Sequence, residues 1–541
     1  MGVNRSAIDL RQSSLVRRLA VDYVYTYDAL AQFYAGNPTS PDAWRVAVAR
    51  TRAHPRDRGA IVEVVRAQQE RRGAPAAARA AADRLRDAST VAVVTGQQAG
   101  LFGGPLYTLL KAITAIRLAH DATVGGAPAV PVFWVDSEDH DWDEAASTTV
   151  LDADLRPQTI TLERPTGAED RPVAWVSLDD RIAQATAALR EILAPTEFTA
   201  PLLAGLEHDY AAGTGVAEAF SRWLERWLGS RGLVVFDAAD PAAKPLASGV
   251  FVHELGRPGH TAALAADAGA ALASLGYHAQ VDAHPDGIAL FHLDDGRQAI
   301  RREAGRLVAG RTTFADDELL ALARTAPEHL SPNVLLRPIV QDTLFPTVCY
   351  VSGPSELAYL GQLRGVYEHF GVPMPLIFPR AMATILDSAA TRFLSRYEVP
   401  FERLQAQDES WLNRLLEAQL PPHVEGALQA ASRAIGEHMS AVVGAVPAVD
   451  PTLEGAARST LGRMDHELRA LHTKVIHAAK KRDETLRRQF NRARAQAFPG
   501  GHLQEREIGF VYFLNRHGAS LVDVLARDLP LEPGRHWILT L

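Results

Sequence analysis

The sequence of 541 residues contains a single cysteine, Cys349, which excludes an intrachain disulfide and a zinc site built from cysteines. It has no run of 18 or more apolar residues, so no membrane-spanning helix is expected. The first 20 residues carry four arginines and lack the uninterrupted apolar core of a secretion signal. These absences favour a soluble, cytoplasmic protein.

The sequence also lacks an excess of positive charge. Lysine and arginine number 56 against 64 aspartates and glutamates, a net charge of −8, so a nucleic-acid binder that works through bulk positive charge is not expected. Hydrophobic residues at 47% and charged residues at 22% are ordinary for globular proteins. The length predicts about two to four structural units.

Short apolar runs alternate with helical patterns along the first three quarters of the chain. The run at residues 91–94 leads into a glycine-rich loop, a helical pattern at 106–120 and a second apolar run at 130–135, which is a strand–loop–helix–strand unit. Similar runs follow at residues 233–236, 347–351 and 374–378. Five such strands with intervening helices predict an α/β fold with a doubly wound parallel sheet over residues 91–388.

Other parts of the chain depart from this alternation. Residues 1–90 read as a helical segment that packs on the core. Two insertions into the core are expected at about residues 148–230 and 276–336. Alternating polar and apolar residues predict partly exposed strands in them, at residues 159–162, 173–176 and 288–291.

A helical domain is expected at residues 389–498. Apolar residues at alternating three- and four-residue spacing form a coiled-coil seam: Leu461, Met464, Leu468, Leu471, Val475 and Ala478. We expect this helix to face residues 401–418 in an antiparallel hairpin, across a segment that contains Pro421, Pro422 and Pro447; an ordinary amphipathic helix is the alternative. The tail, residues 499–541, in which Phe510, Tyr512 and Leu514 alternate, is expected to return to the core.

The glycine-rich loop is the first candidate site. Four glycines lie between a strand end and a helix start, where backbone N–H groups and the helix N-terminus favour phosphate or carboxylate. The loop is neither a P-loop nor a Gly-x-Gly-x-x-Gly motif. A tight turn without a ligand is the alternative, although such a turn would not need the adjacent glutamines Gln97 and Gln98.

The second candidate is the acidic segment, residues 136–144, with six carboxylates and one histidine directly after a buried strand. Carboxylates this dense raise one another's pKa values and favour acid–base chemistry or binding of a substrate. They are also suited to Mg²⁺, and a solvated acidic loop is the third alternative. Ligands of such sheets bind at the carboxyl ends of strands, which favours a catalytic or substrate-binding role.

Residues near the later strands supply the third set. Arg337 and Arg380 are suited to clamp carboxylates or phosphate, with a surface salt bridge as the alternative for each. Glu356 follows Ser355 at a helix start and is either a substrate ligand or part of a helix cap. Cys349 is expected to be a buried core thiol.

Five of these segments resemble the bacillithiol biosynthesis cysteine-adding enzyme (BshC) family: VVTGQQAGLFGGPLYT at 93–108, PVFWVDSEDHD at 131–141, NVLLRP at 333–338, SGPSELAY at 352–359 and FLNRH at 513–517. They are spread along most of the chain. The resemblance implies a Rossmann-like core with two connecting-peptide insertions and an antiparallel coiled-coil domain that forms a homodimer. It further implies a ligase that joins the carboxyl group of cysteine to the amine of glucosaminyl-malate. Likeness to class I aminoacyl-tRNA synthetases is also implied, but their His-x-Gly-His signature is absent.

On this basis residues are assigned to roles. His140, Asp139 and Glu138 are predicted to be catalytic. The predicted substrate-binding residues are Gln97, Gln98, Gly104, Tyr107, Thr108, Asp141, Arg337, Gly353, Glu356, Tyr359 and Arg380. Gly96, Gly100 and Gly103 are predicted to contact an adenine nucleotide, ATP or ADP; no metal ligand is assigned, and a magnesium requirement is left open. Alternative functions are a metal-dependent nucleotidyl transferase or hydrolase that uses the acidic segment, and a non-catalytic dimeric scaffold.

Overall fold

The computed structural model describes residues 4–12, 14–281, 287–303, 305–418, 422–482 and 484–541. The chain divides into two compact units. The first comprises Met1–Thr384 and Gln504–Leu539, and the second comprises Ile385–Leu503 and Thr540–Leu541. The chain therefore leaves the first unit and comes back to it near its end.

A five-stranded parallel sheet forms the centre of the first unit, in the order β13-β12-β2-β3-β6. Its strands are β2 (Val91–Gln97), β3 (Ala129–Val135), β6 (Val234–Asp237), β12 (Thr347–Ser352) and β13 (Leu376–Pro379). Starting from β2 at the centre, the chain adds β3 and β6 on one side of the sheet and later adds β12 and β13 on the other side. This order is that of a doubly wound sheet, so the predicted fold class is confirmed.

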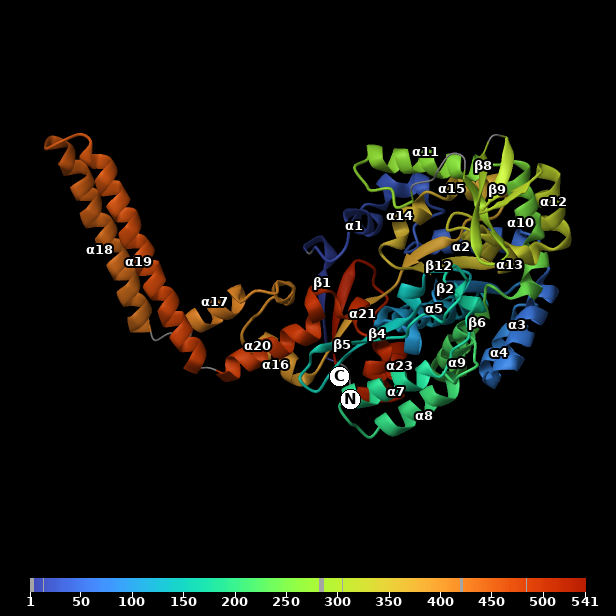
Figure 1. Cartoon of the computed structure of the whole chain (residues 1–541), viewed down its shortest axis with the longest axis horizontal. Coiled ribbons are helices and arrows are strands. Elements are labelled where there is room, and N and C mark those ends of the chain that lie inside the picture. The colour runs from blue at the N-terminus through green and yellow to red at the C-terminus, as the bar shows by residue number, and fades with distance from the viewer. Residues whose placement is uncertain (1–3, 13, 282–286, 304, 419–421, 483) are drawn as a thin grey trace. The chain divides into compact units, whose positions relative to one another are not determined.

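Helices and loops cover both faces of this sheet (Figure 1). Helix α5 (Leu106–Val124) connects β2 to β3 and packs on both strands, while α2 (Pro41–Ala53) packs on β12 and α3 (Arg58–Arg72) on β6. Residues 91–94 are fully buried, which explains their unbroken apolar run. Cys349 is buried in β12, as predicted.

Additional elements separate β3 from β6. They are α6 (Trp142–Ala145), β4 (Ser147–Leu151), β5 (Pro157–Thr161), α7 (Arg181–Ile192), α8 (Thr199–Asp209) and α9 (Val216–Leu228). The strand expected at residues 173–176 is wrong: the segment forms a short 3₁₀ helix, η4 (Val173–Trp175). The N–H groups of Val173 and Ala174 donate to the carbonyls of Asp139 and Ser137, so this backbone braces the acidic segment and pairs with none of the described strands.

A second sheet precedes β12 in sequence. It is antiparallel, in the order β10-β9-β8-β7-β11. Its strands are β7 (Gly287–Leu293), β8 (Arg297–Glu303), β9 (Arg306–Ala309), β10 (Thr312–Phe314) and β11 (Leu330–Pro332). The strand expected at residues 288–291 is confirmed within β7. Helix α10 (Lys244–Gly256) packs against this sheet through β7.

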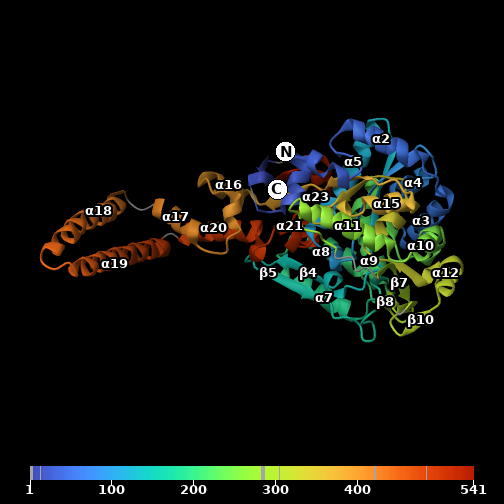
Figure 2. The same ribbon diagram turned by 90° about the horizontal axis from the view of Figure 1, so that it is seen from above.

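The second unit is helical and contains α16 (Ser388–Arg396), α17 (Ser410–Ala418), α18 (Pro422–Ala445), α19 (Leu453–Arg482) and α20 (Glu484–Ala497). Helices α18 and α19 lie side by side as an antiparallel pair (Figures 1 and 2). The coiled-coil prediction is confirmed, but the predicted partner segment, residues 401–418, is not the main one: its helix α17 contacts α19, whereas α18 packs along α19 more extensively. The chain reverses at η9 (Val446–Ala448), around Pro447, and the main partner is the helix directly before it. Pro421 lies outside the described residues.

The seam of α19 is only partly covered. Leu461, Leu468 and Val475 are half-buried, whereas Met464 and Leu471 remain 40% and 50% exposed.

In the last segment, residues 510–514 are all buried within α22 (Phe510–His517), so the alternation at 510, 512 and 514 does not mark a strand. The chain ends in β15 (Arg535–Thr540). None of the described helices combines the length and the apolar character needed to cross a membrane.

Candidate functional site

Two adjacent cavities open at the carboxyl ends of β2, β3 and β12. The first, here called the strand-end cavity, measures about 320 Å³ and is lined by Gly96, Gln97, Gln98, Tyr107, Lys111, Trp134, Asp136, Asp139, Glu144, Val334, Arg337, Tyr350, Gly353, Ser355, Glu356, Tyr359, Arg380 and Arg506. It lies where the sheet changes winding direction between β2 and β12, which is where ligands of such folds bind.

The second, here called the loop cavity, measures about 300 Å³ and lies beside the start of α5. It is lined by Gln97, Gln98, Gly100, Gly104, Pro105, Tyr107, Thr108, Glu144, Ser147, Thr148, Thr149, Arg506, Glu507 and Gly509. The two cavities share a wall made of Gln97, Gln98, Tyr107, Glu144 and Arg506. A ligand in one cavity is therefore within reach of a ligand in the other.

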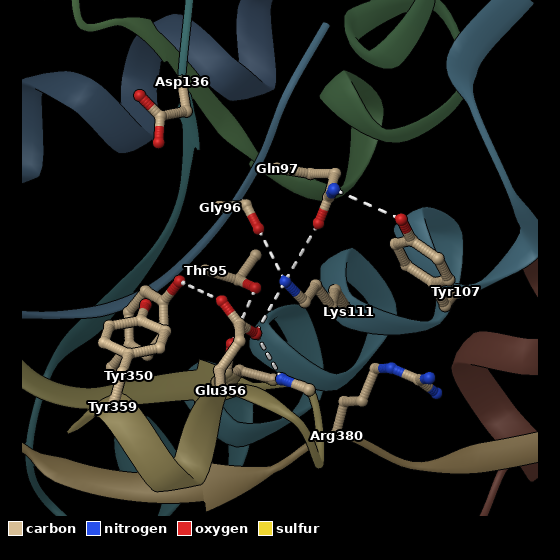
Figure 3. A network of polar contacts seen from close by, with 12 residues as sticks. Thr95, Gly96, Gln97, Tyr107, Lys111, Asp136, Tyr350, Glu356, Tyr359 and Arg380 are labelled. Carbon is tan, nitrogen blue, oxygen red and sulfur yellow. Dashed lines mark hydrogen bonds and ion pairs between the residues drawn. The ribbon is translucent and has the colours of Figure 1, made fainter. Parts of the chain in front are cut away.

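A buried lysine, Lys111, organises the floor of the strand-end cavity (Figure 3). Its Nζ donates to Gly96 O at 2.8 Å and to Gln97 Oε1 at 3.1 Å, and it lies 2.8 Å from Glu356 Oε2. Gln97 in turn donates through Nε2 to Tyr107 Oη at 3.2 Å and to Glu144 Oε1 at 3.0 Å. The side-chain amide of Gln97 thus has its carbonyl turned inward and its NH₂ turned toward both cavities.

Glu356 is held as a carboxylate. Burial by itself would raise its pKa, but the ammonium group of Lys111 and the N–H of Gly353 outweigh burial, and the pKa lies below its usual value. Tyr350 also donates to Glu356, at 3.2 Å. Glu356 therefore does more than cap a helix: it joins β12 to α5 through Lys111.

The acidic segment lines the strand-end cavity with three carboxylates, those of Asp136, Asp139 and Glu144. Gln98 Nε2 donates to Asp139 Oδ2 at 2.7 Å, and Arg297 Nη1 lies 3.2 Å from Asp139 Oδ1. The glycine-rich loop and the acidic segment thus meet directly.

The other two residues predicted to be catalytic lie apart from the cavities. Glu138 is buried in an ion pair with Lys244, whose Nζ also donates to Leu330 O at 3.2 Å. His140 is 46% exposed and lines neither cavity. Asp141 also lines neither: its Oδ1 accepts from the N–H of Glu144 at the start of α6.

Three guanidinium groups line the strand-end cavity, and two of them, Arg337 and Arg380, were predicted from the sequence. Arg337 donates to Tyr359 Oη at 3.2 Å and lies 3.6 Å from Asp136. Burial opposes its charge, but Tyr359, Tyr350 and Asp136 outweigh burial and hold the pKa of Arg337 above its usual value. Arg380 is buried in an ion pair with Glu505 at 2.8 Å, and its Nε has no partner among the described residues. Neither arginine forms the surface salt bridge considered as an alternative.

The four loop glycines differ in their surroundings. Gly96 lines the strand-end cavity, and Gly100 and Gly104 line the loop cavity. Gly103 lines neither; it has a φ of 97°, and a Cβ there would lie 2.3 Å from Phe510. Gly103 is therefore required by packing and by its backbone conformation.

Three buried polar groups that belong to residues of the loop cavity wall have no hydrogen-bond partner among the described residues: Gln98 Oε1, Thr108 Oγ1 and Thr148 Oγ1. Buried polar atoms are normally satisfied, so these three point to a bound ligand or water. Thr108 lies in the first turn of α5, where the helix dipole favours an anion.

The structure adds residues that were not assigned to the site from the sequence: Lys111, Asp136, Glu144, Tyr350 and Arg506. Lys111 lies one helical turn after Tyr107, and this spacing was a usable signal. Arg506 comes from the C-terminal segment, far along the chain, and no local pattern marks it. No group of three or more His, Cys, Asp or Glu side chains suited to hold a metal ion occurs in the described ranges.

The fold and the site define a Rossmann-like α/β protein with a polar ligand site at the winding reversal of its sheet. Residues 3–381 match the family model for the "Bacillithiol biosynthesis BshC, N-terminal Rossmann-like domain", and residues 383–541 match that for the "C-terminal coiled-coil domain" of the same family. The chain belongs to the bacillithiol biosynthesis BshC family.

Curated relatives agree with this assignment. A protein of Salinibacter ruber is 36% identical over 528 residues, which cover 96% of each chain. One of Koribacter versatilis is 32% identical over 519 residues, again 96% of each, and one of Solibacter usitatus is 30% identical over 533 residues, 98% of this chain and 99% of the relative. All three carry the name "Putative cysteine ligase BshC".

Proposed function

We propose that this protein joins the carboxyl group of L-cysteine to the amine of glucosaminyl-malate, the last step of bacillithiol biosynthesis. The observation that supports this most is the shared wall of the two cavities, because amide ligation needs an activated acyl group and an amine held side by side. Family membership and the names of the relatives support the same reaction class.

The strand-end cavity suits the charges of these substrates. Arg337 and Arg380 bind the malate carboxylates in this proposal, and Arg506 adds a third guanidinium group on the shared wall. The carboxylates of Asp136 and Asp139 are suited to the ammonium group of cysteine. Gly353, Tyr359 and Glu356 shape the far wall of the cavity.

A free carboxylate is a poor electrophile, so the carboxyl group of cysteine must first be activated. In this proposal ATP supplies the activation, and cysteine becomes an acyl-adenylate or an acyl-phosphate. The phosphate binds in the loop cavity, which is lined by Gly100, Gly104, the helix N-terminus of α5 and Thr108 with its hydroxyl group. The amine nitrogen then attacks the carbonyl carbon, the C–N bond forms, and the phosphate leaves with the electrons of the C–O bond.

The test is a complete reaction with purified protein, cysteine, glucosaminyl-malate and ATP, analysed by mass spectrometry. The proposal predicts the amide product with one equivalent of AMP or ADP, and product loss on Arg337→Met. An exposed arginine outside both cavities, Arg45→Met, is the matched control and retains activity. A wild-type protein that forms no amide with ATP, with or without Mg²⁺, contradicts the proposal.

A further inference from the structure

Glu144 occupies a distinctive position: its carboxylate lies on the wall that the two cavities share. It sits in the short helix α6, whose start is capped by Asp141. Its Oε1 accepts from Gln97 Nε2 at 3.0 Å. A group at this junction faces both reactants of a ligation at once.

The donor to Glu144 is itself fixed. Gln97 can present its NH₂ to Glu144 only if its carbonyl faces the other way, and Lys111 holds that carbonyl at 3.1 Å. The remaining N–H bonds of Lys111 go to Gly96 O and Glu356. A chain of contacts from Glu356 through Lys111 and Gln97 therefore sets the position of Glu144.

The neighbouring carboxylates are less suited to accept a proton. Asp139 has donors on both oxygens, Gln98 on Oδ2 and Arg297 on Oδ1, and Asp136 has Arg337 at 3.6 Å. Both oxygens of Asp139 are therefore already occupied by donors, and Asp136 lines only the strand-end cavity, although burial raises its pKa as well. Among the described residues, no lysine or arginine nitrogen lies within 4.0 Å of the Glu144 carboxylate.

The surroundings of Glu144 also strengthen it as a base. Although the side chain opens to the two cavities, desolvation by the surrounding protein raises its pKa. The carboxylates of Asp141, Asp139 and Asp136 act in the same direction, and Lys111 acts against them. Tyr107 and Arg506 line the same shared wall as Glu144, and Glu507 lines the loop cavity beside it.

We propose that Glu144 is the catalytic base that takes the proton from the attacking amine. The inference rests on the proposed ligase function and extends it. As the amine nitrogen bonds to the acyl carbon and the phosphate leaves with the electron pair, one N–H bond breaks and its proton passes to the Glu144 carboxylate. Gln97 and Lys111 are positioning residues for this step.

The test compares Glu144→Gln with Asp143→Asn, a neighbour in α6 that is exposed and lines neither cavity. Glu144→Gln is expected to lower kcat by about 10²- to 10⁴-fold with the KM for the amine substrate changed less than threefold. The acid limb that the wild-type enzyme shows in its pH–rate profile is expected to be absent from the profile of Glu144→Gln. In Glu144→Ala, added formate is expected to restore part of the rate, and Asp143→Asn is expected to behave as wild type.

Three results overturn the assignment. The first is a Glu144→Gln protein that keeps the wild-type kcat and acid limb while the wild type forms the amide. The second is loss of the limb in Asp139→Asn or Asp136→Asn with Glu144→Gln unaffected. The third, a wild-type protein that forms no amide at all, overturns the ligase proposal itself and this step with it.

Discussion

Gln98 Nε2 donates a hydrogen bond of 2.7 Å to Asp139 Oδ2. This contact joins the glycine-rich loop after β2 to the acidic segment after β3, and it places both on the strand-end cavity. The two longest motifs of the sequence therefore belong to one site. The alternative in which the loop is a plain turn leaves the arrangement of its glutamines unexplained.

Removal of the Lys111 ammonium is predicted to destabilise the Rossmann-like unit. Lys111→Met leaves the half-buried Glu356 carboxylate without its ion-pair partner, a change that costs less than the loss of about 3–5 kcal/mol typical of fully buried pairs. Hydrogen exchange of β2 and β12 in denaturant measures the loss. The double variant Lys111→Met/Glu356→Gln is expected to recover part of it, and equal stability of the single variant and the wild type would refute the prediction.

The buried pair Glu138–Lys244 offers a way to separate structure from catalysis. Each single variant, Glu138→Met or Lys244→Met, is predicted to cost about 3–5 kcal/mol because one buried charge is left unpaired. The double variant is expected to regain most of this stability and to retain ligase activity. A double variant that is stable yet inactive would instead support the catalytic role predicted for Glu138 from the sequence.

Stability is predicted to fall as the pH drops below about 6.5, in part because of His536. This residue is fully buried, and burial lowers its pKa to about 4. Between pH 6.5 and 4 the unfolded chain takes up a proton that folded His536 does not, so the free energy of unfolding decreases by up to about 3 kcal/mol. Denaturant titrations at pH 7, 5.5 and 4.5 measure the free energy of unfolding, which should decrease less in His536→Gln than in the wild type. His120→Gln, at an exposed position, is the control. The same decrease with pH in all three proteins would contradict the account.

Dimerisation is predicted to depend on the uncovered half of the α19 seam. Met464 and Leu471 are 40% and 50% exposed in the single chain, and a second copy of the hairpin would cover them. Met464→Glu and Leu471→Glu are expected to weaken the dimer at least tenfold, about 1.4 kcal/mol, in sedimentation experiments. Arg463→Glu, on the exposed surface of the same helix, should leave the dimer intact, and a wild-type monomer would refute the prediction.

Much of the fold could be predicted because local pattern determines it. The apolar run at residues 91–94 can only be a buried strand once a glycine loop and a helical pattern follow it. The partner of α19 could not be predicted from periodicity alone, since Pro421, Pro422 and Pro447 all offered places for a reversal.

The motifs of the site could be predicted from the sequence, but the contacts between their side chains could not. The acidic segment marks the cavity, yet only three-dimensional contacts show that Glu138 pairs with Lys244 while Glu144 faces Gln97. Both partners lie far away in the sequence. Gly103 was likewise assigned to a ligand, whereas its surroundings are set by Phe510 near the end of the chain.

The central claim is that ligation takes place where the Gln97–Gln98 pair meets the acidic segment. A crystal structure of the protein with cysteine and glucosaminyl-malate tests it most directly. The account predicts the malate carboxylates beside Arg337 and the amine within hydrogen-bonding distance of Glu144. Both substrates bound elsewhere, with the strand-end cavity free of them, would contradict it.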